Sequence, residues 1–452
     1  MESEAASSSA TLLNDQLSKK TITAEQVAAL VNSGDVIEYG MSINQPDLFD
    51  RALAQRKQEL RDVYIRGTLT VSPRQVVLAD PEQQHFSYDN WHFSTWDRRQ
   101  FDEHLVSYIP FNFGESPEIY RDHLHIDLLV IKTTTMDRHG YFNFGASNAM
   151  VRVACEIAQR VVVETSSALP RCYGIENAVH ISEVDAVIVG DNQPPVELPS
   201  APVSDIDRQV ADYILREVDD GACLQIGIGG MPNAVCSALA DSSIRDLGVH
   251  TEMFVDGMVD LAERGKLTGA RKRTYRGKIA YSFALGSARC YDFIDQNEQC
   301  ISLPVNETNL PENIARNANV VSINNAMQID LSGQVCSESA GYAQRTGTGG
   351  QLQFVRGAFM SPGGKSFICL SSRFSRGDQS VSRIVPGVQP GTVVTTPRTD
   401  VMYVVTEYGI ANLKGKSVAQ RAQTLIGLAH PDDRDQLHQQ ARDAGMLNRR
   451  YW

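Results

Sequence analysis

Short, continuous runs of apolar residues recur along the whole chain and alternate with segments that read as helices. In the first half they include residues 63–71 (VYIRGTLTV), 125–136 (HIDLLVIKTTTM), 160–165 (RVVVET) and 184–190 (VDAVIVG). Uninterrupted Val, Ile and Leu are typical of strands in a parallel sheet that helices cover on both faces. The pattern therefore predicts an α/β protein built on open, mostly parallel sheets.

The second half of the chain continues this pattern. Its expected strands are residues 222–227 (ACLQIG), 279–286 (IAYSFALG), 318–330 (ANVVSINNAMQID), 367–372 (FICLSS), 391–396 (GTVVTT) and 401–406 (VMYVVT). Ligands of such sheets gather at the carboxyl ends of the strands. The functional residues are therefore expected in the turns that follow strands.

Two passages of the chain share one order of elements. Residues 23–56 read as a helix, a strand, a turn running from glycine to proline, and a second helix, and residues 204–241 repeat this order. In the first passage Thr23 and Gln26 fit a capping box, and Gly34 is a natural helix end. We interpret the similarity as a weak internal repeat. It predicts two related α/β domains that face each other across an active-site cleft.

The domain boundaries follow from composition. Residues 1–15 lack the basic and apolar regions of a secretory signal and are expected to be a flexible leader. The proline-rich stretch 193–204 is the best candidate for a linker. We therefore predict an N-terminal domain over 16–195 and a C-terminal domain over 204–452. The full length of 452 residues is too long for one ordinary core.

Charge and composition exclude several classes of function. The net charge is −12, and no run of Lys or Arg exceeds the RKR at 271–273, so nucleic-acid binding is not expected. No apolar stretch is long enough to cross a bilayer. The eight cysteines form no CxxC pair and the histidines form no HExxH motif, so no metal site is predicted. The cysteines read as reduced thiols of a cytoplasmic protein.

The most informative carboxylate is Glu252 in the segment 248–261 (GVHTEMFVDGMVDL). It stands at the end of a short apolar strand, just before a new amphipathic run. A solvated strand end is the plain alternative. A carboxylate is already ionised at neutral pH, so its value as a nucleophile depends on its position and on the loss of its hydration shell.

Two glycine-rich turns accompany this carboxylate. The first, 225–232 (QIGIGGMP), lies between a strand and a helix, where backbone amides can face an anion or a developing oxyanion. Many such turns hold glycine only for close packing. In the second, 346–358 (TGTGGQLQFVRGA), Gly349 and Gly350 would let the backbone approach a thioester closely. A nucleophile beside amide donors is what covalent acyl transfer requires.

Five motifs in order resemble a known family. They are QIGIGGMPNAV, HTEMFVDGMVDL, VSINNAMQIDLSGQVCSESAG, GTGGQLQFVRGA and TEYGIANLKGKS. The series resembles the acetyl-CoA hydrolase/transferase family, in particular its 4-hydroxybutyrate CoA-transferase and butyryl-CoA:acetate CoA-transferase branch. In the first half, 133–148 (TTTMDRHGYFNFGASN) and 180–190 (HISEVDAVIVG) agree with it. The resemblance covers nearly the whole chain apart from the leader.

The resemblance implies a ping-pong mechanism in which Glu252 attacks an acyl-CoA and then carries CoA as a glutamyl thioester. It implies CoA and acyl-CoA as substrates, no permanently bound cofactor, and a homodimer or larger homo-oligomer. It also assigns residues to oxyanion and CoA contacts and to the acyl pocket. The oxyanion and CoA contacts are Gln225, Gly227, Ile228, Gly229, Asn309, Gly347, Gly349 and Gly350, and the pocket residues are Met231, Met136, His139 and Tyr141.

Two further features, the carboxylate of Glu307 and the loop 136–145, each allow more than one interpretation. Glu307, in the segment 304–312 (PVNETNLPE), lies near a proposed ligand-binding stretch, and we predict a structural or supporting role for it. The loop 136–145 (MDRHGYFNFG) is either a turn with a packed aromatic pair or, as the resemblance implies, part of the acyl pocket.

The predicted reaction is CoA transfer from acetyl-, butyryl- or succinyl-CoA to a carboxylic acid such as 4-hydroxybutyrate, butyrate or itaconate. Among the predicted acceptor acids we rank short-chain monocarboxylates first and itaconate and succinate second. A dicarboxylate would need a cation in the pocket, for which Lys132, Arg138 and Arg356 are the candidates. Two alternatives stay open: an acyl-CoA hydrolase, in which water intercepts the intermediate, and a non-catalytic acyl-CoA-binding paralogue.

Overall fold

The computed structural model describes residues 2–198, 201–377 and 379–451. Met1 at the start of the predicted leader, residues 199–200 in the predicted linker and Trp452 at the chain end lie outside the described residues. The chain divides into two units. Unit 1 comprises residues 1–111, 115–198 and 281–306, and unit 2 comprises 112–114, 199–280 and 307–452.

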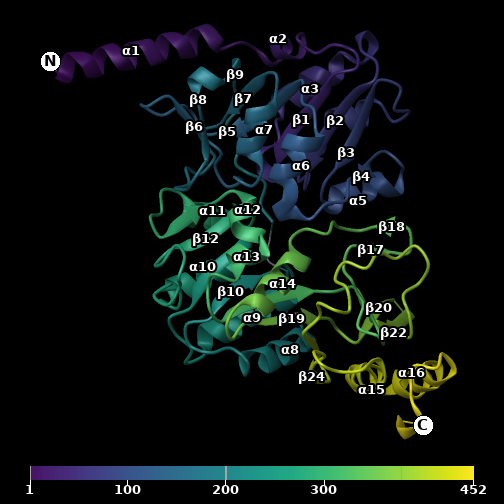
Figure 1. The fold of residues 1–452 in the computed structure, drawn as a ribbon. Coiled ribbons are helices and arrows are strands. Elements are labelled where there is room, and N and C mark those ends of the chain that lie inside the picture. Colours follow the sequence, from purple (N-terminus) through teal and green to yellow (C-terminus); the bar gives the residue numbers. More distant parts are fainter. Residues whose placement is uncertain (1, 199–200, 378, 452) are drawn as a thin grey trace. The chain divides into compact units, whose positions relative to one another are not determined.

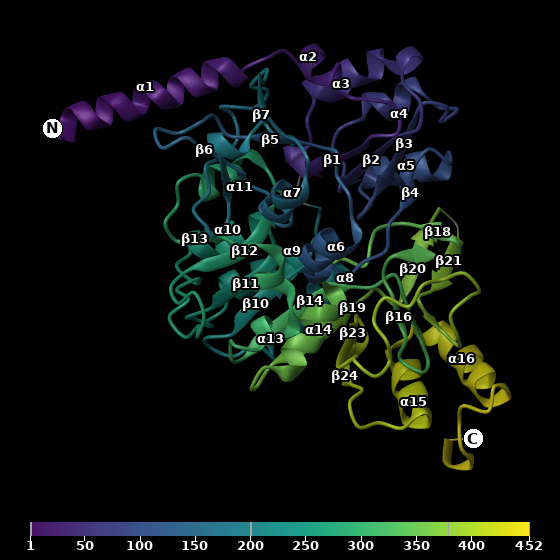
Figure 2. The same cartoon turned by 45° about the horizontal axis from the view of Figure 1, so that its top comes forward.

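Unit 1 is organised around a parallel sheet with strand order β4-β3-β2-β1-β5-β7-β9 (Figures 1 and 2). Each neighbouring pair in this order is parallel. The strands are β1 (Val36–Met41), β2 (Val63–Thr68), β3 (Phe86–Asn90), β4 (Ser107–Tyr108), β5 (Leu128–Thr133), β7 (Val161–Thr165) and β9 (Ala186–Val189). The predicted strands 63–71, 125–136, 160–165 and 184–190 are therefore confirmed.

Helices of unit 1 form two groups. Helices α2, α3 and α4 pack side by side, and α6 packs on α7, which also contacts β1. The helices are α1 (Glu2–Lys20), α2 (Ala24–Ala28), α3 (Leu48–Gln55), α4 (Gln75–Ala79), α5 (Thr95–Asp102), α6 (Ser116–His123), α7 (Val151–Ile157) and α11 (Ala288–Ile294). Phe49, Leu53 and Val76 from the first group join strand residues such as Ile37 and Ile65 in a core.

Unit 2 repeats this topology. From the central strand β10, its sheet continues through β11 on one side and through β14, β19, β23 and β24 on the other. All of these pairs are parallel except β23 with β24. The strands are β10 (Cys223–Ile226), β11 (Gly248–Phe254), β14 (Val320–Asn325), β19 (Lys365–Cys369), β23 (Tyr403–Thr406) and β24 (Gly409–Asn412). In both units the first strand is central, as the predicted repeat requires.

The helices of unit 2 lie against this sheet and against a small C-terminal layer. Helices α9 and α14 both contact β14, and α8 packs on α9. The helices are α8 (Asp205–Leu215), α9 (Gly230–Asp241), α10 (Asp256–Glu263), α12 (Val305–Asn309, which begins in unit 1), α13 (Pro311–Ile314), α14 (Gln351–Met360), α15 (Val418–Leu428) and α16 (Pro431–Asp443). Helices α15 and α16, yellow in Figure 1, share an apolar core with Ile329, Val335 and Ile384.

Shorter elements complete the fold. The remaining strands are β6 (Tyr141–Asn143), β8 (Ala178–His180), β12 (Ile279–Ala284), β13 (Cys300–Ser302), β15 (Gln328–Asp330), β16 (Val335–Cys336), β17 (Ser339–Ala340), β18 (Ala343–Gln344), β20 (Arg373–Arg376), β21 (Gln379–Ser382) and β22 (Ile384–Val385). The 3-10 helices are η1 (Ser42–Asn44), η2 (Lys57–Glu59), η3 (Phe113–Glu115), η4 (Ile181–Glu183) and η5 (Arg449–Tyr451). Strands β6 and β8 form an antiparallel pair that holds Tyr141.

The structure confirms the α/β fold with large parallel sheets in two units and corrects several details. Helix α1 begins at Glu2 and so covers the segment predicted to be a flexible leader, whose Ala, Leu and Glu residues favour helix. Residues 281–306, predicted in the C-terminal domain, belong to unit 1. The predicted strand 391–396 is irregular, because the amides of Thr395 and Thr396 both donate to the Val335 carbonyl.

The first predicted helix is also shorter than expected. The capping box of Thr23 with Gln26 is present, but α2 ends at Ala28 rather than near Gly34. The Asn32 amide donates to the Asp35 carboxylate at 2.8 Å, a local bond that competes with helical hydrogen bonding.

Candidate functional site

Glu252 lies near the carboxyl end of β11, one strand away from the centre of the sheet in unit 2. The strand ends at Phe254, and α10 begins at Asp256, so the carboxylate stands where the chain turns from strand to helix. The side chain is half-buried, while Met253 and Phe254 beside it are buried. The structure thus confirms the predicted strand end and leaves this carboxylate partly open to solvent.

The Glu252 carboxylate accepts hydrogen bonds from two donors in separate parts of unit 2. The Asn309 side-chain amide donates to Oε2 with an Nδ2–Oε2 distance of 2.6 Å. The backbone N–H of Gly350 also donates to this carboxylate. Asn309 ends α12, and Gly350 directly precedes α14. The structure therefore brings together three residues that the sequence predicted for one site, although 98 positions separate the first from the last.

Gly350 is needed at this point for steric reasons. A Cβ atom there would lie closer than 3.0 Å to both Glu252 Oε2 and Asn309 Nδ2. Its φ of −99° is open to any residue, so the requirement comes from the close approach of the backbone to the carboxylate.

Burial changes the protonation of Glu252. Loss of solvent raises its pKa to about 7, and the hydrogen bonds from Asn309 and Gly350 oppose this rise. A nucleophilic carboxylate with a pKa near neutrality is poorly solvated and is therefore more reactive than one in water.

A buried glutamate anchors the loop that delivers Gly350. Glu338, only 2% exposed, accepts hydrogen bonds from the hydroxyls of Thr348 at 3.1 Å and Thr395 at 3.0 Å. Its backbone carbonyl accepts from the amides of Arg345 and Thr346. The sequence analysis missed Glu338, and the only signal was its place in the family motif that ends in SESAG.

Other predicted contacts in the second glycine turn do not reach the carboxylate directly. Gly349 adopts a φ of +56°, which favours glycine, and its carbonyl accepts from the amide of Phe113 at 3.2 Å. The carbonyl of Gly347 accepts from the hydroxyl of Thr346 at 3.1 Å. Gly347 and Gly349 therefore shape the loop that leads to Gly350, whose backbone N–H donates to Glu252.

The first glycine turn joins β10 to α9 as predicted. One of its backbone amides, that of Gly227, is already hydrogen-bonded within the sheet. The Gly227 N–H donates to the Ile323 carbonyl at 3.0 Å and so continues the sheet. Gly229 has a φ of +123°, which only glycine adopts without strain, and Ile228 is 49% exposed. The Ile228 carbonyl accepts from Asn325 Nδ2 at 3.2 Å.

Gln225 and Met231 flank this turn. The Gln225 side chain is buried and accepts from Ser322 Oγ at 2.7 Å, so it belongs to a polar network within the sheet. Met231 is buried and lines a cavity of about 290 Å³ beside the turn, together with Gly230, Asn325 and Arg383. The Arg383 guanidinium lies over the ring of Phe374 at 5.4 Å.

Met136, His139 and Tyr141 lie in unit 1. His139 is exposed, and its Nε2 accepts from Arg138 Nε at 3.0 Å. Tyr141 is 44% exposed and packs edge-on against His180 with ring centroids 4.9 Å apart. The part of these residues in an acyl pocket stays a prediction.

Glu307, the rival carboxylate, has a partner of its own. Its Oε2 accepts from the Tyr275 hydroxyl at 3.0 Å. Glu307 lies in the middle of α12, two positions before the Asn309 donor, and its bond to Tyr275 fits the supporting role that we predicted for it.

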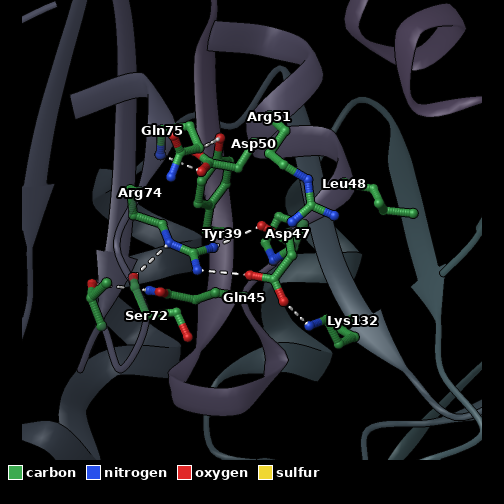
Figure 3. Close-up of polar contacts among 12 residues, drawn as sticks. Tyr39, Gln45, Asp47, Leu48, Asp50, Arg51, Ser72, Arg74, Gln75 and Lys132 are labelled. Carbon is green, nitrogen blue, oxygen red and sulfur yellow. Dashed lines mark hydrogen bonds and ion pairs between the residues drawn. The ribbon is translucent and has the colours of Figure 1, made fainter. Parts of the chain in front are cut away.

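Two of the three candidate cations are paired with aspartates inside their own units. Lys132 forms an ion pair with Asp47, which also accepts from Arg74 at 2.8 Å (Figure 3). These cations hold the pKa of Asp47 below its usual value despite its burial. Arg356 pairs with Asp400 at 2.9 Å. Lys132 and Arg356 are therefore engaged in structural ion pairs.

The part of the chain that the structure describes contains neither a metal-binding cluster nor a membrane-spanning helix. Within residues 2–198, 201–377 and 379–451, no group of three or more His, Cys, Asp or Glu side chains could hold a metal ion. Among the same residues, no helix has both the length and the apolar character required to cross a membrane.

The chain matches models of both halves of one protein family. Residues 7–198 match the acetyl-CoA hydrolase/transferase N-terminal domain, and residues 286–441 match the acetyl-CoA hydrolase/transferase C-terminal domain. A butyryl-CoA:acetate CoA-transferase of Anaerostipes caccae is 44% identical over 439 residues, which cover 96% of this chain and 98% of that protein.

Further similarity comes from a second relative and a crystal structure. The 4-hydroxybutyrate coenzyme A transferase of Clostridium kluyveri is 34% identical over 93% of this chain and 96% of its own. The crystal structure of RipA from Yersinia pestis is 36% identical and superposes with a TM-score of 0.89, covering 96% of this chain and 100% of RipA. The resemblance seen in the sequence motifs is confirmed.

Proposed function

Because this chain belongs to the acetyl-CoA hydrolase/transferase family and is an enzyme that transfers CoA, we propose that it exchanges CoA between a short-chain acyl-CoA and a carboxylic acid, with Glu252 as nucleophile. One observation carries this proposal. The poorly solvated carboxylate of the half-buried Glu252 accepts hydrogen bonds from an amide side chain and from a backbone N–H that belong to two separate segments.

The proposed first half-reaction loads CoA onto the enzyme. A Glu252 oxygen attacks the thioester carbonyl of the acyl-CoA, and the C–S bond breaks to release the CoA thiolate and leave a mixed anhydride. The thiolate then attacks the glutamyl carbonyl of this anhydride. The bond between the glutamyl carbon and the bridging oxygen breaks, the first carboxylate departs with that oxygen, and Glu252 holds CoA as a thioester.

The second half-reaction runs the same steps in reverse with another acid. Its carboxylate attacks the glutamyl thioester and expels the CoA thiolate, which gives a new anhydride. The thiolate attacks the acyl carbonyl of this anhydride and releases the new acyl-CoA and the Glu252 carboxylate. No net proton, electron or water enters the exchange, so the chemistry is balanced by the substrates alone.

Asn309 and Gly350 are the proposed oxyanion donors of these steps. In the free enzyme they hold Glu252, and each tetrahedral intermediate would place negative charge within their reach. Donors fixed before the reaction stabilise such charge without reorganising, and removal of one typically costs about 10²–10³ in rate. The role of the glycine turn 227–230 is to let CoA approach the sheet closely.

We propose that the cavity beside this turn binds a part of CoA that is distant from the thioester. It lies over β14 and β19, two and three strands from β11 in the sheet. At about 4.8 Å per strand this is on the order of 10–15 Å, which the pantetheine arm can span. Arg383, in the cavity wall, is suited to a phosphate group. Binding energy from this remote part would assist the reacting centre.

The acceptor acid that we propose is a short-chain monocarboxylate. Lys132 and Arg356 are paired with aspartates, so neither offers an unpaired charge to a second carboxylate. Acetate, butyrate and 4-hydroxybutyrate are the first candidates, followed by itaconate and succinate.

An exchange assay tests the proposal. The enzyme would be given acetyl-, butyryl- or succinyl-CoA with each acid in turn, and the new acyl-CoA would be measured. We expect exchange only when an acceptor acid is present. CoA release of equal rate without an acceptor would identify a hydrolase instead, and inactivity across the whole panel would favour an acyl-CoA-binding protein.

A further inference from the structure

The amide of Asn309 has two chemically different ends, and only one suits the carboxylate. Nδ2 can donate to Glu252, whereas Oδ1 only accepts and would repel the ionised oxygen. Asn309 is fully buried and lies in a helix of five residues. Something in the structure must therefore keep the nitrogen, and not the oxygen, directed at Glu252.

The preceding residue occupies the oxygen end of this amide. The Thr308 hydroxyl donates to Asn309 Oδ1 with an oxygen–oxygen distance of 2.8 Å. Thr308 is also fully buried, so water does not replace this bond. A rotated amide would place Oδ1 against a carboxylate that only accepts, and the Thr308 hydroxyl would lose its bond to Oδ1 and have to turn from donating to accepting. The Thr308 hydroxyl bond thus favours the orientation in which Nδ2 faces Glu252.

The strand that carries the nucleophile also holds Thr308 in place. His250 Nε2 lies 3.0 Å from the Thr308 carbonyl oxygen. Since a carbonyl only accepts, Nε2 carries the proton of this pair. His250 precedes Glu252 by two positions on β11, so both side chains leave the strand on the same face. The strand that carries Glu252 therefore also contacts the residue that precedes the Asn309 donor.

His250 adds no charge to this arrangement at neutral pH. Burial and the nearby Lys272 lower its pKa to about 3, so the ring is neutral. Lys272 donates to the carbonyls of Val249 at 2.6 Å and Lys278 at 2.8 Å, and burial lowers its pKa to about 8. The influences identified on the Glu252 pKa are its own burial and the bonds from Asn309 and Gly350.

We propose that Thr308 is a positioning residue: its hydroxyl fixes the Asn309 amide with its nitrogen toward Glu252, and its backbone carbonyl is held by His250 on the nucleophile's strand. The inference rests on the proposed function for its catalytic consequence. Its structural part, the orientation of the amide, concerns the free protein and is testable without any turnover.

The matched variants are Thr308→Val and Thr308→Ser. Valine keeps the shape of threonine and removes the hydroxyl, while serine keeps the hydroxyl and removes a methyl group. We expect T308V to lower kcat/KM for exchange by about tenfold or more, and to move the midpoint of its pH profile above the wild-type value near 7. T308S should restore both. If Thr308 served only in packing, T308S, which loses a methyl group, would be more impaired than T308V.

A second readout is independent of activity. The pH dependence of the difference in Tm between wild type and E252Q reports the Glu252 pKa in the free protein. The same comparison between T308V and T308V/E252Q should place that pKa higher. If T308V does not fold, T308A compared with T308S isolates the hydroxyl in the same way.

The outcomes are distinct. An unchanged Glu252 pKa in T308V, or a T308S variant as impaired as T308V, would overturn the inference. A wild-type protein that exchanges no CoA would refute the proposed function, and the stability measurement would still decide the role of Thr308.

Discussion

Replacement of Glu252 by glutamine should stabilise the protein, and the gain should depend on pH. Burial raises the pKa of this carboxyl from 4.5 to about 7. A raised pKa means that the folded protein binds the proton more tightly than the unfolded chain does. Below pH 4.5 the residue is protonated in both the folded and the unfolded state, so its burial does not lower the free energy of unfolding. Between pH 4.5 and about 7 the unfolded chain loses the proton and the folded protein keeps it, so the wild type loses stability over this range, and the loss is complete above pH 7; E252Q stays neutral throughout.

The size of this effect follows from the pKa. One pKa unit is worth about 1.4 kcal/mol, so complete burial would give a gain of about 3 kcal/mol at pH 8. Glu252 is only half-buried, and solvent screening reduces the gain to about 2 kcal/mol. For a unit of this size the corresponding rise in Tm is about 4–8 °C.

Thermal unfolding of wild type and E252Q between pH 4.5 and 8.5 provides the measurement. The difference in Tm should be smallest at pH 4.5, grow through pH 6–7 and level off above pH 7.5. Glu312→Gln is the control, because it removes one negative charge at an exposed position of the same unit. A Tm difference that is constant with pH, or that matches the control, would refute the desolvated carboxylate on which the reasoning depends.

Two further variants test other parts of the structure. Gly350→Ala should fold but lose about a hundredfold or more in exchange rate, because its Cβ would meet Glu252 and Asn309; wild-type rates in steady-state assays would contradict the geometry of the site. Arg66→Met should lower the free energy of unfolding of unit 1 by about 3–5 kcal/mol, because it leaves the Glu38 carboxylate, bonded to Arg66 at 2.6 Å, buried without its cation. In denaturant titrations the double variant R66M/E38Q should recover much of that loss, and an equally unstable double variant would argue against this explanation.

The sequence predicted the fold well where the signal was local. Buried strands such as 160–165 carry continuous valines, and the capping box at Thr23 marks a helix start that the structure contains. The irregular segment 391–396 was misread, because its valines and threonines favour strand, whereas its pairing with β16 is an isolated bridge between Thr396 and Val335. Tertiary contacts decided that segment, and no local pattern reports them.

The candidate site was predictable only in part. Glu252 follows from its place at a strand end, but its contact with Asn309 and Gly350 depends on the order of β11, β10 and β14 in the sheet. The motifs and the family resemblance supplied these residues without showing their geometry. Thr308 and Glu338 were missed, because a hydroxyl that orients an amide and a carboxylate that anchors a loop have no spacing of their own in a sequence.

The central claim is that Glu252 becomes covalently bound to CoA. The most direct measurement is incubation with acetyl- or butyryl-CoA, reduction of the trapped thioester with borohydride, and peptide mapping by mass spectrometry, with E252Q as the matched control. The account predicts reduction of the Glu252 side chain in the peptide that spans β11 in wild type, and an unmodified peptide in E252Q. Modification of another residue, or none at all during rapid exchange, would contradict it.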